Sequence, residues 1–288
     1  MTYTLFLGDR SYSSWSLRAW LLCEAFELPY RSKFVDFSLE ASVAEQLDDP
    51  LLRTVPALRL PGGGVLSDSI SIAEELASLH PEAGLWPEDP AARAVARNLT
   101  AEMHSGFGDL RGDCPMNLRL AYRGFEPSDG VRADLARIEA IWAAAREAHG
   151  AGGPWLCGRY SIADAFYAPV AARIATYDLP VGEAGQAYVA AQLAHEPFRR
   201  WRAMGLASGE TLEWYLKDLP LRDWPGPKPL DARAIETGPS ENAACPYSGD
   251  PVTHFLALDD RVFGFCNAFC RDKTVADPEA WPKFMALM

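Results

Sequence analysis

A short serine-rich motif near the start of the chain could bind and activate a thiol. It reads Tyr12-Ser13-Ser14-Trp15-Ser16-Leu17-Arg18 and separates an apolar, β-prone stretch from an apolar helical one. Hydroxyl groups at such a position can cap the helix or point into the space above it, where backbone N–H groups and the helix dipole favour an anion. The candidates for chemistry are Ser13, Ser14 and Ser16; the alternative is that all three serve only as helix caps.

One serine hydroxyl is strong enough to ionise a thiol at neutral pH. A free thiol has a pKa of about 8.5, and lowering it by about 2 units takes about 2.7 kcal/mol. A hydroxyl-to-thiolate hydrogen bond supplies about 1.5–3 kcal/mol because it is charge-assisted. The positive end of a helix adds about 0.3–1 kcal/mol. Neither a metal nor a general base is therefore needed.

A second motif, Thr54-Val55-Pro56-Ala57-Leu58, could pair with a peptide-like ligand. A proline has no N–H to give to a sheet, so Pro56 belongs at the start or edge of a strand. If the Val55–Pro56 bond is cis, the main chain of Val55 faces the cleft and can bind a ligand as an added strand.

A third motif, Ser67-Asp68-Ser69, opens a predicted helix and offers groups for the two ends of an amino acid. The hydroxyl and N–H of Ser69 can meet a carboxylate, and Asp68 can receive an ammonium group. The alternative is a plain helix N-cap. A fourth candidate, Arg18, either reaches the substrate or is a solvated or structural charge.

The first eighty residues predict a thioredoxin-like order of strands and helices. The expected elements are a strand at 3–7, a helix from Trp15 to Phe26, a strand at 33–37, a short helix within 38–53, two strands at 57–60 and 65–66 joined by a glycine-rich turn, and a helix at 69–79. From 90 to about 216 strand signals vanish, and helical runs cover 91–106, 131–149, 162–177 and 184–193. We therefore expect an α/β thioredoxin-like domain (1–82), an all-α domain (88–217), a proline-rich linker (218–241) and a small α+β cysteine module (242–288).

Two further positions in the helical domain have more than one interpretation. Ser161 and Asp164 form a capping-box pattern, which indicates a helix start and not chemistry. His104 is either a pocket residue with an acid/base role or a hydrogen-bonded histidine at a domain interface. No Ser-His-Asp triad can be inferred from the scattered histidines.

The order of these motifs resembles that of the cytosolic glutathione S-transferase family over roughly residues 3–215. The YSSWSLR segment is similar to the serine motif of zeta-like members, in which the first serine of an S-S-x-S run activates glutathione. That implies Ser13 as the activating residue, with Ser14 and Ser16 in support. The TVPAL stretch resembles the family's cis-proline motif, and SDS its acidic residue–serine motif, which implies that Val55, Pro56, Asp68 and Ser69 bind glutathione.

The resemblance implies an enzyme of detoxification. It would activate glutathione, its co-substrate, for attack on a small hydrophobic electrophile admitted by the helical domain, with thiol peroxidase or isomerase side activity, and it would form a homodimer. Trp15 stands where zeta enzymes have a cysteine, which argues against maleylacetoacetate-type isomerisation.

Three of the six cysteines lie within the last forty-four residues, in the pattern C-x20-C-x3-C. Together with the apolar-Gly-Phe-Cys approach to Cys266, the pattern resembles a TRASH/YHS-type metal-binding module. Cys245, Cys266 and Cys270 would hold zinc or a soft metal, with His254 or water as the fourth ligand. Ser248 stands where many such modules have another cysteine, so the alternative is that the thiols pack a small hairpin core. A module of this size needs a metal or a neighbour to be stable, so without metal it should dock on the body.

Composition narrows the remaining function classes. A net charge of −12 gives no advantage on a phosphate backbone, so nucleic acid is not expected as a partner. No segment approaches the roughly 18 apolar residues of a membrane helix, and the first thirty residues do not read as a signal peptide, so a cytoplasmic location is expected. The alternative to an enzyme is a transferase scaffold that senses metal or oxidants through its cysteine module.

Overall fold

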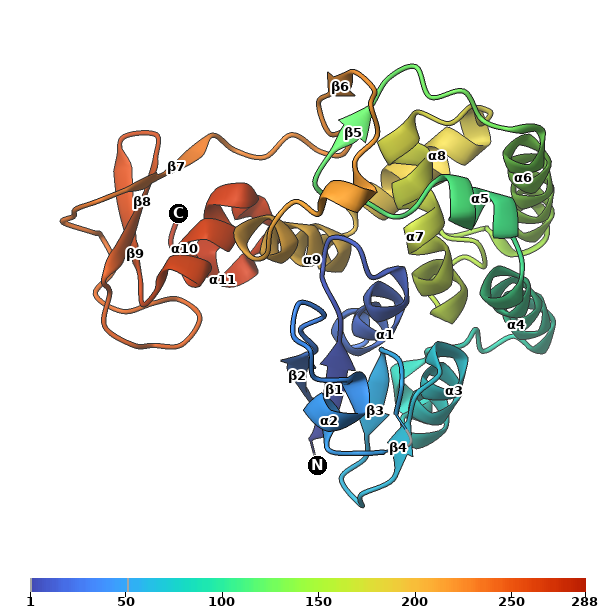
Figure 1. The fold of residues 1–288 in the computed structure, drawn as a ribbon, viewed down its shortest axis with the longest axis horizontal. Coiled ribbons are helices and arrows are strands. Elements are labelled where there is room, and N and C mark those ends of the chain that lie inside the picture. The colour runs from blue at the N-terminus through green and yellow to red at the C-terminus, as the bar shows by residue number, and fades with distance from the viewer. Residues whose placement is uncertain (1, 51) are drawn as a thin grey trace.

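The computed structural model describes residues 2–50 and 52–288, and the chain forms three parts (Figure 1). A mixed sheet with its helices lies at the bottom of Figure 1, a group of helices lies above and to the right, and a smaller lobe extends to the left. None of the helices in the described residues combines the length and the apolar character that crossing a bilayer requires.

The N-terminal part has the predicted thioredoxin-like order. Its elements are β1 (Tyr3–Leu7), α1 (Ser14–Ala25), β2 (Tyr30–Phe34), α2 (Val43–Leu47), β3 (Ala57–Arg59), β4 (Val65–Leu66) and α3 (Ser69–Leu79). The sheet has the order β2-β1-β3-β4, in which β1 and β2 run parallel and the other pairs are antiparallel. Because β1 is central, its end delivers the chain to the start of α1 at the edge of the sheet.

The second strand was placed wrongly by the sequence pattern, at 33–37 instead of Tyr30–Phe34. Strand β2 is at the edge of the sheet and most of its residues are exposed, so it lacks the apolar alternation that marks a half-buried strand. Asp36 begins a turn instead, because its carboxylate accepts hydrogen bonds from the N–H and hydroxyl of Ser38.

The middle part is helical, as predicted. It contains α4 (Pro90–Ser105), α5 (Gly108–Asp113), α6 (Asp129–His149), α7 (Ile162–Tyr177), α8 (Glu183–Ala194) and α9 (Glu196–Ala207), with short 3-10 turns at Pro81–Ala83 and Glu213–Tyr215 and a short strand β5 (Ala121–Tyr122). The sequence analysis missed α5 and α9. Helix α9 buries Phe198 and Trp201 completely, but the several arginines between and beside them make its apolar pattern hard to recognise in the sequence.

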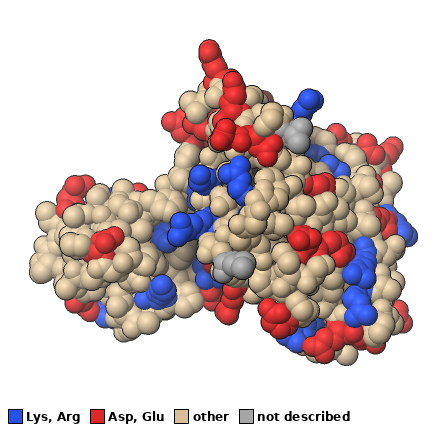
Figure 2. Space-filling model, turned by 90° about the horizontal axis from the view of Figure 1, so that it is seen from below, with Lys and Arg blue, Asp and Glu red and all other residues tan. Residues whose placement is uncertain are grey.

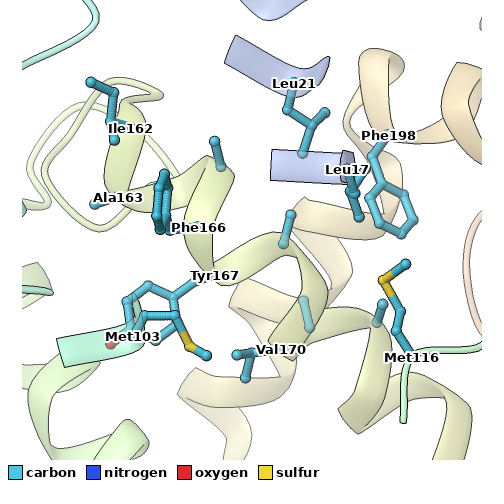
Figure 3. Close-up of a cluster of buried hydrophobic side chains, with 14 of the residues drawn as sticks. Leu17, Leu21, Met103, Met116, Ile162, Ala163, Phe166, Tyr167, Val170 and Phe198 are labelled. Atoms are coloured by element: carbon cyan, nitrogen blue, oxygen red, sulfur yellow. The ribbon is translucent and has the colours of Figure 1, made fainter. Parts of the chain in front are cut away.

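Helix α7 is the centre of the body. All of its residues are buried, and it contacts α1, α4 and α8. Figure 3 shows Phe166, Tyr167 and Val170 of α7 among Leu17 and Leu21 from α1, Met103 from α4 and Phe198 from α9. The two domains thus share one hydrophobic core, which runs through α7.

The start of α7 is fixed by Asp164, as the capping-box pattern predicts. Its fully buried carboxylate accepts hydrogen bonds from the N–H of Leu156, the N–H and hydroxyl of Ser161, and the hydroxyl of Tyr188. Burial raises the pKa of Asp164 to about 6, although these hydrogen bonds act to lower it. One side chain therefore joins the start of α7 to the preceding loop and to α8.

The proline-rich segment predicted as a linker (218–241) carries two strands. Strand β6 (Leu221–Arg222) pairs with β5, so it folds back on the helical body. Strand β7 (Ala232–Ile235) pairs with β8 (His254–Leu258) and is the first strand of the C-terminal sheet. The cysteine-bearing lobe therefore begins before residue 242, at β7.

The C-terminal lobe is an antiparallel sheet of order β7-β8-β9 with helices against it. The remaining elements are β9 (Arg261–Phe265), α10 (Ala268–Ala276), a 3-10 turn at Pro278–Ala280 and α11 (Pro282–Met285). The lobe docks on the body, because α10 lies along α9 (Figure 1) and Ala203 of α9 belongs to the lobe's own hydrophobic core. The guanidinium of Arg199 also donates two hydrogen bonds, of 2.8 and 2.6 Å, to the carboxylate of Asp277.

We predict that Asp164→Ala strongly destabilises the protein. The substitution leaves the N–H groups of Leu156 and Ser161 and the hydroxyl of Tyr188 buried without an acceptor, at about 1–3 kcal/mol for each group. We expect the free energy of unfolding, measured by urea denaturation, to fall by about 3 kcal/mol or more. The exposed Asp231→Ala should change it by less than about 0.5 kcal/mol. A loss below about 1 kcal/mol for Asp164→Ala would show that α7 does not need this cap.

Candidate active site

The serine motif forms the N-terminus of α1. Ser13 is the N-cap, and its hydroxyl oxygen accepts the N–H of Ser16 at 3.3 Å. The Ser13 hydroxyl donates to the Ser16 hydroxyl oxygen at 2.8 Å, and that oxygen also accepts the N–H of Gly8 at 2.9 Å. Ser16 is fully buried and Ser14 nearly so, whereas Ser13 is partly exposed. Of the three candidates, Ser13 is thus the one whose hydroxyl can meet a ligand while another serine supports it.

A cavity of about 530 Å³ opens in front of Ser13. Its lining comes from the loop before α1, the chain around Val55, the helical domain and the segment after α9. The residues are Asp9, Tyr12, Ser13, Ser14, Trp15, Phe37, Arg53, Thr54, Val55, Arg111, Pro115, Met116, Arg173, Leu212, Trp214 and Tyr215. A cavity of this size accommodates a small organic ligand.

The Val55–Pro56 peptide bond is cis, as the second motif anticipates. Val55 lies on the cavity wall, and Pro56 is buried directly before β3. A Cβ on Gly8 would lie 3.1 Å from a side-chain carbon of Val55, 3.0 Å from one of Phe37 and 3.4 Å from the Cβ of Ser13, so any larger residue would crowd these side chains. The Val55 side chain therefore lies close to the loop that carries Ser13.

Asp68 and Ser69 do not line this cavity, although they lie at the start of α3. Asp68 is the N-cap of that helix, and its carboxylate accepts the N–H groups of Ile70 and Ser71. The hydroxyl of Ser69 is buried and has no hydrogen-bond partner among the described residues. Asp68 therefore performs the cap that the sequence analysis gave as the alternative, and Ser69 keeps a free hydroxyl.

His104 lies between the domains, as the second of its two interpretations expects, but its buried Nδ1 has no hydrogen-bond partner among the described residues. Its Nε2 is 3.4 Å from a carboxylate oxygen of Asp68, and its ring meets that of Trp15 edge-on at 5.2 Å between centroids. Burial lowers the pKa of His104, and the charge of Asp68 opposes that shift. His104 is not among the residues that line the cavity.

Three arginines lie close together beside the cavity: Arg18 and Arg111 both contact Trp15, and Arg173 lies near enough for its charge to act on Arg18. The guanidinium groups of Arg18 and Arg111 lie 4.3 and 4.9 Å from the centre of the Trp15 ring. Burial lowers the pKa of Arg18, and the charges of Arg173 and Arg111 add to this effect. Among the described residues, none of the three arginines forms an ion pair with a carboxylate. Figure 2 shows acidic side chains over much of the visible surface, in keeping with the net charge of −12.

Arg111 and Arg173 are site residues that the sequence analysis missed. They come from two separate helices, α5 and α7, and no spacing in the sequence connects them. The only signal was Arg173 itself, the one charged residue of α7 besides its capping residue Asp164. A charge in such a helix is costly unless something binds it, so it marks a functional candidate.

The segment after α9 forms another wall that the sequence did not predict. We call residues 208–217 the strap. The N–H of Leu212 donates to the Tyr12 hydroxyl at 3.1 Å, and the ring of Tyr215 stacks on that of Tyr12 at 4.4 Å. Leu212, Trp214 and Tyr215 of the strap line the cavity. The strap therefore holds its side chains against the loop that carries Ser13.

The three C-terminal cysteines form a second cluster, in the smaller lobe. The sulfur atoms of Cys245, Cys266 and Cys270 lie within 4.8 Å of one another. The Ser248 hydroxyl donates to the sulfur of Cys266 at 3.3 Å, so it lies beside the cluster. His254, the fourth ligand considered from the sequence, is not part of the group and lies against Thr253 instead.

Polar groups around Cys245 favour its thiolate. Burial raises the pKa of this thiol, but the N–H groups of Cys266, Ser248 and Tyr247 outweigh burial and lower the pKa to about 7. The ammonium of Lys273 lies nearby, at 3.7 and 3.9 Å from the ring centres of Tyr247 and Trp281. The cluster can therefore hold a thiophilic ion, and metal-ligand chemistry fits the donor set.

Comparisons with known proteins match the N-terminal part and the helical body of the chain. Residues 12–79 match the family model described as the glutathione S-transferase N-terminal domain. A probable maleylacetoacetate isomerase from Caenorhabditis elegans is 32% identical over 105 residues, which cover 35% of this chain and 46% of that protein. The chain thus matches about half the length of this curated relative.

Solved structures share the fold of the body. A glutathione transferase homologue from Burkholderia with bound glutathione superimposes with a TM-score of 0.54 at 24% identity, covering 73% of this chain and 100% of its own. A glutathione transferase from Methylococcus capsulatus gives a TM-score of 0.52 at 22% identity, covering 70% and 98%. The body therefore has the fold of glutathione transferases, and its residues 12–79 match their N-terminal domain.

We predict that Ser16→Ala costs stability and Ser14→Ala does not. Ser16→Ala leaves the buried N–H of Gly8 without an acceptor, so we expect the free energy of unfolding to fall by about 1–3 kcal/mol. The Ser14 hydroxyl has only a 3.5 Å approach from Arg173, so Ser14→Ala should cost less than about 0.5 kcal/mol. Urea denaturation of both variants measures the difference. Equal losses would contradict the support role of Ser16.

Proposed function

We propose that this protein is a glutathione-dependent transferase in which Ser13 stabilises the thiolate of glutathione. The observation that carries the proposal is the Ser13 hydroxyl, which sits at the N-terminus of α1, faces a ligand-sized cavity and is backed by a buried second serine. The match of residues 12–79 to the transferase N-terminal domain and the bound glutathione of the Burkholderia homologue support the same ligand.

The Gly8 N–H, the Ser16 hydroxyl and the Ser13 hydroxyl can form a chain of hydrogen bonds that ends at the sulfur of glutathione. Because hydroxyl hydrogens rotate, Ser16 can donate to Ser13 while it continues to accept the N–H of Gly8. Ser13 is then free to donate to a sulfur anion in the cavity. Each bond in such a chain polarises the next, so the bond to the thiolate gains from the two behind it.

The remaining motif residues hold the rest of the tripeptide in this proposal. The main chain of Val55, next to cis-Pro56, pairs with the peptide backbone of glutathione. The free hydroxyl of Ser69 and the carboxylate of Asp68 would receive the γ-glutamyl end, and Arg53, which lines the cavity with Val55, would meet the glycyl carboxylate. The unpartnered hydroxyl of Ser69 supports this assignment, since a buried polar group without a partner is unfavourable.

The reaction is attack of the thiolate on an electrophilic carbon of a second substrate. The helical domain and the strap supply the walls for that substrate. The curated relative is a probable maleylacetoacetate isomerase, so glutathione-dependent isomerisation is an alternative outcome of the same attack. A homodimer, which the resemblance implies, stays a prediction for light scattering.

We predict that Ser13→Ala raises the pKa of bound glutathione. Without the hydroxyl, the thiolate loses a charge-assisted bond of about 1.5–3 kcal/mol, which corresponds to a tenfold to hundredfold loss in kcat/KM at neutral pH. The loss should shrink as the pH rises toward the pKa of free glutathione, because the thiol then ionises unaided.

Ultraviolet absorbance of the bound thiolate, followed against pH, measures the shift directly. Ser78→Ala on the exposed side of α3 is the matched control and should leave both the pKa and kcat/KM unchanged. An unaltered pH profile for Ser13→Ala would refute the role of Ser13. Failure of glutathione to bind at millimolar concentration in calorimetry would refute the enzymatic function as a whole.

A second candidate function, metal or redox sensing, is supported by the thiol cluster of the smaller lobe. The Cys266 and Cys270 sulfurs are 3.9 Å apart, near the about 3.8 Å that two thiolates adopt on one tetrahedral zinc ion with 2.3 Å bonds. Cys245 completes a set of three, and Ser248 or water would take the fourth position. When bound, the ion would crosslink the hairpin to α10 and so stabilise the lobe.

We predict that the protein, dialysed against zinc and then against buffer, retains about one ion per chain. Cys266→Ser should lose most of this metal because only two thiols remain, whereas Cys157→Ser, in the body, should keep it. Elemental analysis by mass spectrometry measures the content. A metal-free wild type, with the same thermal stability before and after chelation, would contradict the sensing function without affecting the enzymatic one.

A further inference from the structure

We propose that the second substrate is a flat, aromatic electrophile that carries a carboxylate, held by Arg111 and Arg173 at the inner end of the cavity. The inference rests on the proposed function and narrows the substrate class. The sequence analysis implied a hydrophobic electrophile, but the cavity wall from the helical domain combines apolar rings with two guanidinium groups.

Arg173 is presented to the cavity with its charge uncompensated. It is 5% exposed, and its Nε and Nη1 donate to the carbonyl oxygens of Cys114 and Pro169 at 2.8 and 3.1 Å. Its Nη2 points toward Ser14, 3.5 Å from the hydroxyl, and has no closer partner among the described residues. Neutral carbonyls fix the guanidinium in place without cancelling its charge, so an anion in the cavity would gain a charge-assisted partner.

Arg111 and Arg18 add to the same field. Arg111 lines the cavity on one side of Trp15, and Arg18 lies behind the same ring, completely buried. The one carboxylate on the cavity lining is Asp9, and its Oδ1 already accepts the N–H groups of Ser11 and Tyr12. Three neighbouring cations repel one another, and a bound anion relieves that repulsion.

The mouth of the cavity is suited to an aromatic body. Trp214 on the strap is 77% exposed and Phe37 after β2 is 63% exposed, yet both belong to the lining. Trp15, Pro115 and Met116 continue this apolar surface inward. Flat rings gain from stacking on such side chains, and exposed aromatic groups at a cavity mouth indicate ligand contact.

The arginines lie on the wrong side of the cavity to serve the carboxylates of glutathione. The groups proposed for glutathione, Val55 and Ser69, belong to the first domain, and Arg53 is the cation beside them. Arg111 and Arg173 belong to α5 and α7 of the helical domain. Since Arg173 approaches Ser14, the neighbour of Ser13, a carboxylate bound there would keep its own ring close to the sulfur.

A chlorodinitrobenzoate and its methyl ester form a matched pair of substrates for the test. The glutathione thiolate, having lost its proton to water, bonds to the ring carbon that carries chlorine, and chloride leaves with the electron pair of the broken bond. Both compounds undergo this substitution, but only the acid carries a charge. After division by the uncatalysed rates, we expect kcat/KM for the acid to exceed that for the ester by about tenfold or more.

Arg111→Met tests the charge at a position that is not fully buried. We expect it to lower kcat/KM for the acid about tenfold and for the ester less than twofold, with Arg111→Lys in between. Arg132→Met, exposed on α6, is the control and should change neither. An equal loss of kcat/KM for the acid and the ester would show that Arg111 stabilises the thiolate and not the carboxylate of the substrate, and would overturn the proposal. A higher kcat/KM of the wild type for the ester than for the acid would overturn it as well.

Trp214→Ala tests the aromatic part. It should raise KM for both chlorodinitro compounds about threefold to tenfold, and should leave KM for iodoacetate, a small electrophile with a carboxylate, unchanged. An equal change of KM for all three compounds would show that Trp214 does not stack on the aromatic ring of the substrate.

A binding experiment separates this inference from the proposed function. Dinitrobenzoate and its methyl ester, which have no leaving group, are titrated into the wild type and Arg111→Met by calorimetry. Tighter binding of the acid that is lost in Arg111→Met supports the anion site even if glutathione neither binds nor reacts. Equal affinities for acid and ester would refute the anion site even if Ser13 activates glutathione as proposed.

Discussion

The body of this protein depends on one buried carboxylate. Asp164 ties together the start of α7, the loop that precedes it and α8. Since α7 contacts α1, α4 and α8, its position decides how the helical domain meets the thioredoxin-like one. Arg173 lies on the same helix, so the capping interaction also decides where this cation stands relative to Ser14. Asp164, which does not line the cavity, thereby helps to position Arg173, which does. The buried core around Phe166 and Val170 holds the helix between them in place.

The sequence predicts the parts of the site that arise from local rules. Ser13 is visible because a cap needs a hydroxyl at the junction of strand and helix, and Asp164 because a capping box has a fixed spacing. Helix α7 is predicted with its actual bounds since a capping box followed by a mostly apolar run admits few alternatives. The edge strand Tyr30–Phe34 is misplaced because an exposed edge carries no periodic signal. Arg111, Arg173 and Trp214 escape prediction for a different reason: they meet only in space, and no local rule relates a short helix, a buried helix and a strap.

Helix α9 connects the two clusters of polar chemistry. One of its faces buries Phe198 and Trp201 in the body, and the Trp201 N–H donates to the carbonyl of Arg10 at 2.6 Å, in the loop before Ser13. Its other face receives α10, which begins between Cys266 and Cys270. The Arg10 guanidinium lies 3.8 Å from the Phe34 ring and 5.5 Å from that of Phe269, the residue before Cys270. The lobe therefore contributes contacts to the loop of the candidate active site in addition to its own core.

The net charge of the chain and the arginines inside the cavity act differently on the proposed substrates. The chain carries a net charge of −12, which would repel both glutathione and a second carboxylate. That repulsion is screened beyond about 8 Å at physiological ionic strength, whereas a guanidinium inside the cavity acts across little water and is screened far less. A thiolate and a carboxylate brought close together would also repel each other, and the cost grows as the distance between them falls. Arg111 and Arg173 line the same cavity as Ser13, so by neutralising the charge of the bound carboxylate they would weaken its repulsion of the thiolate.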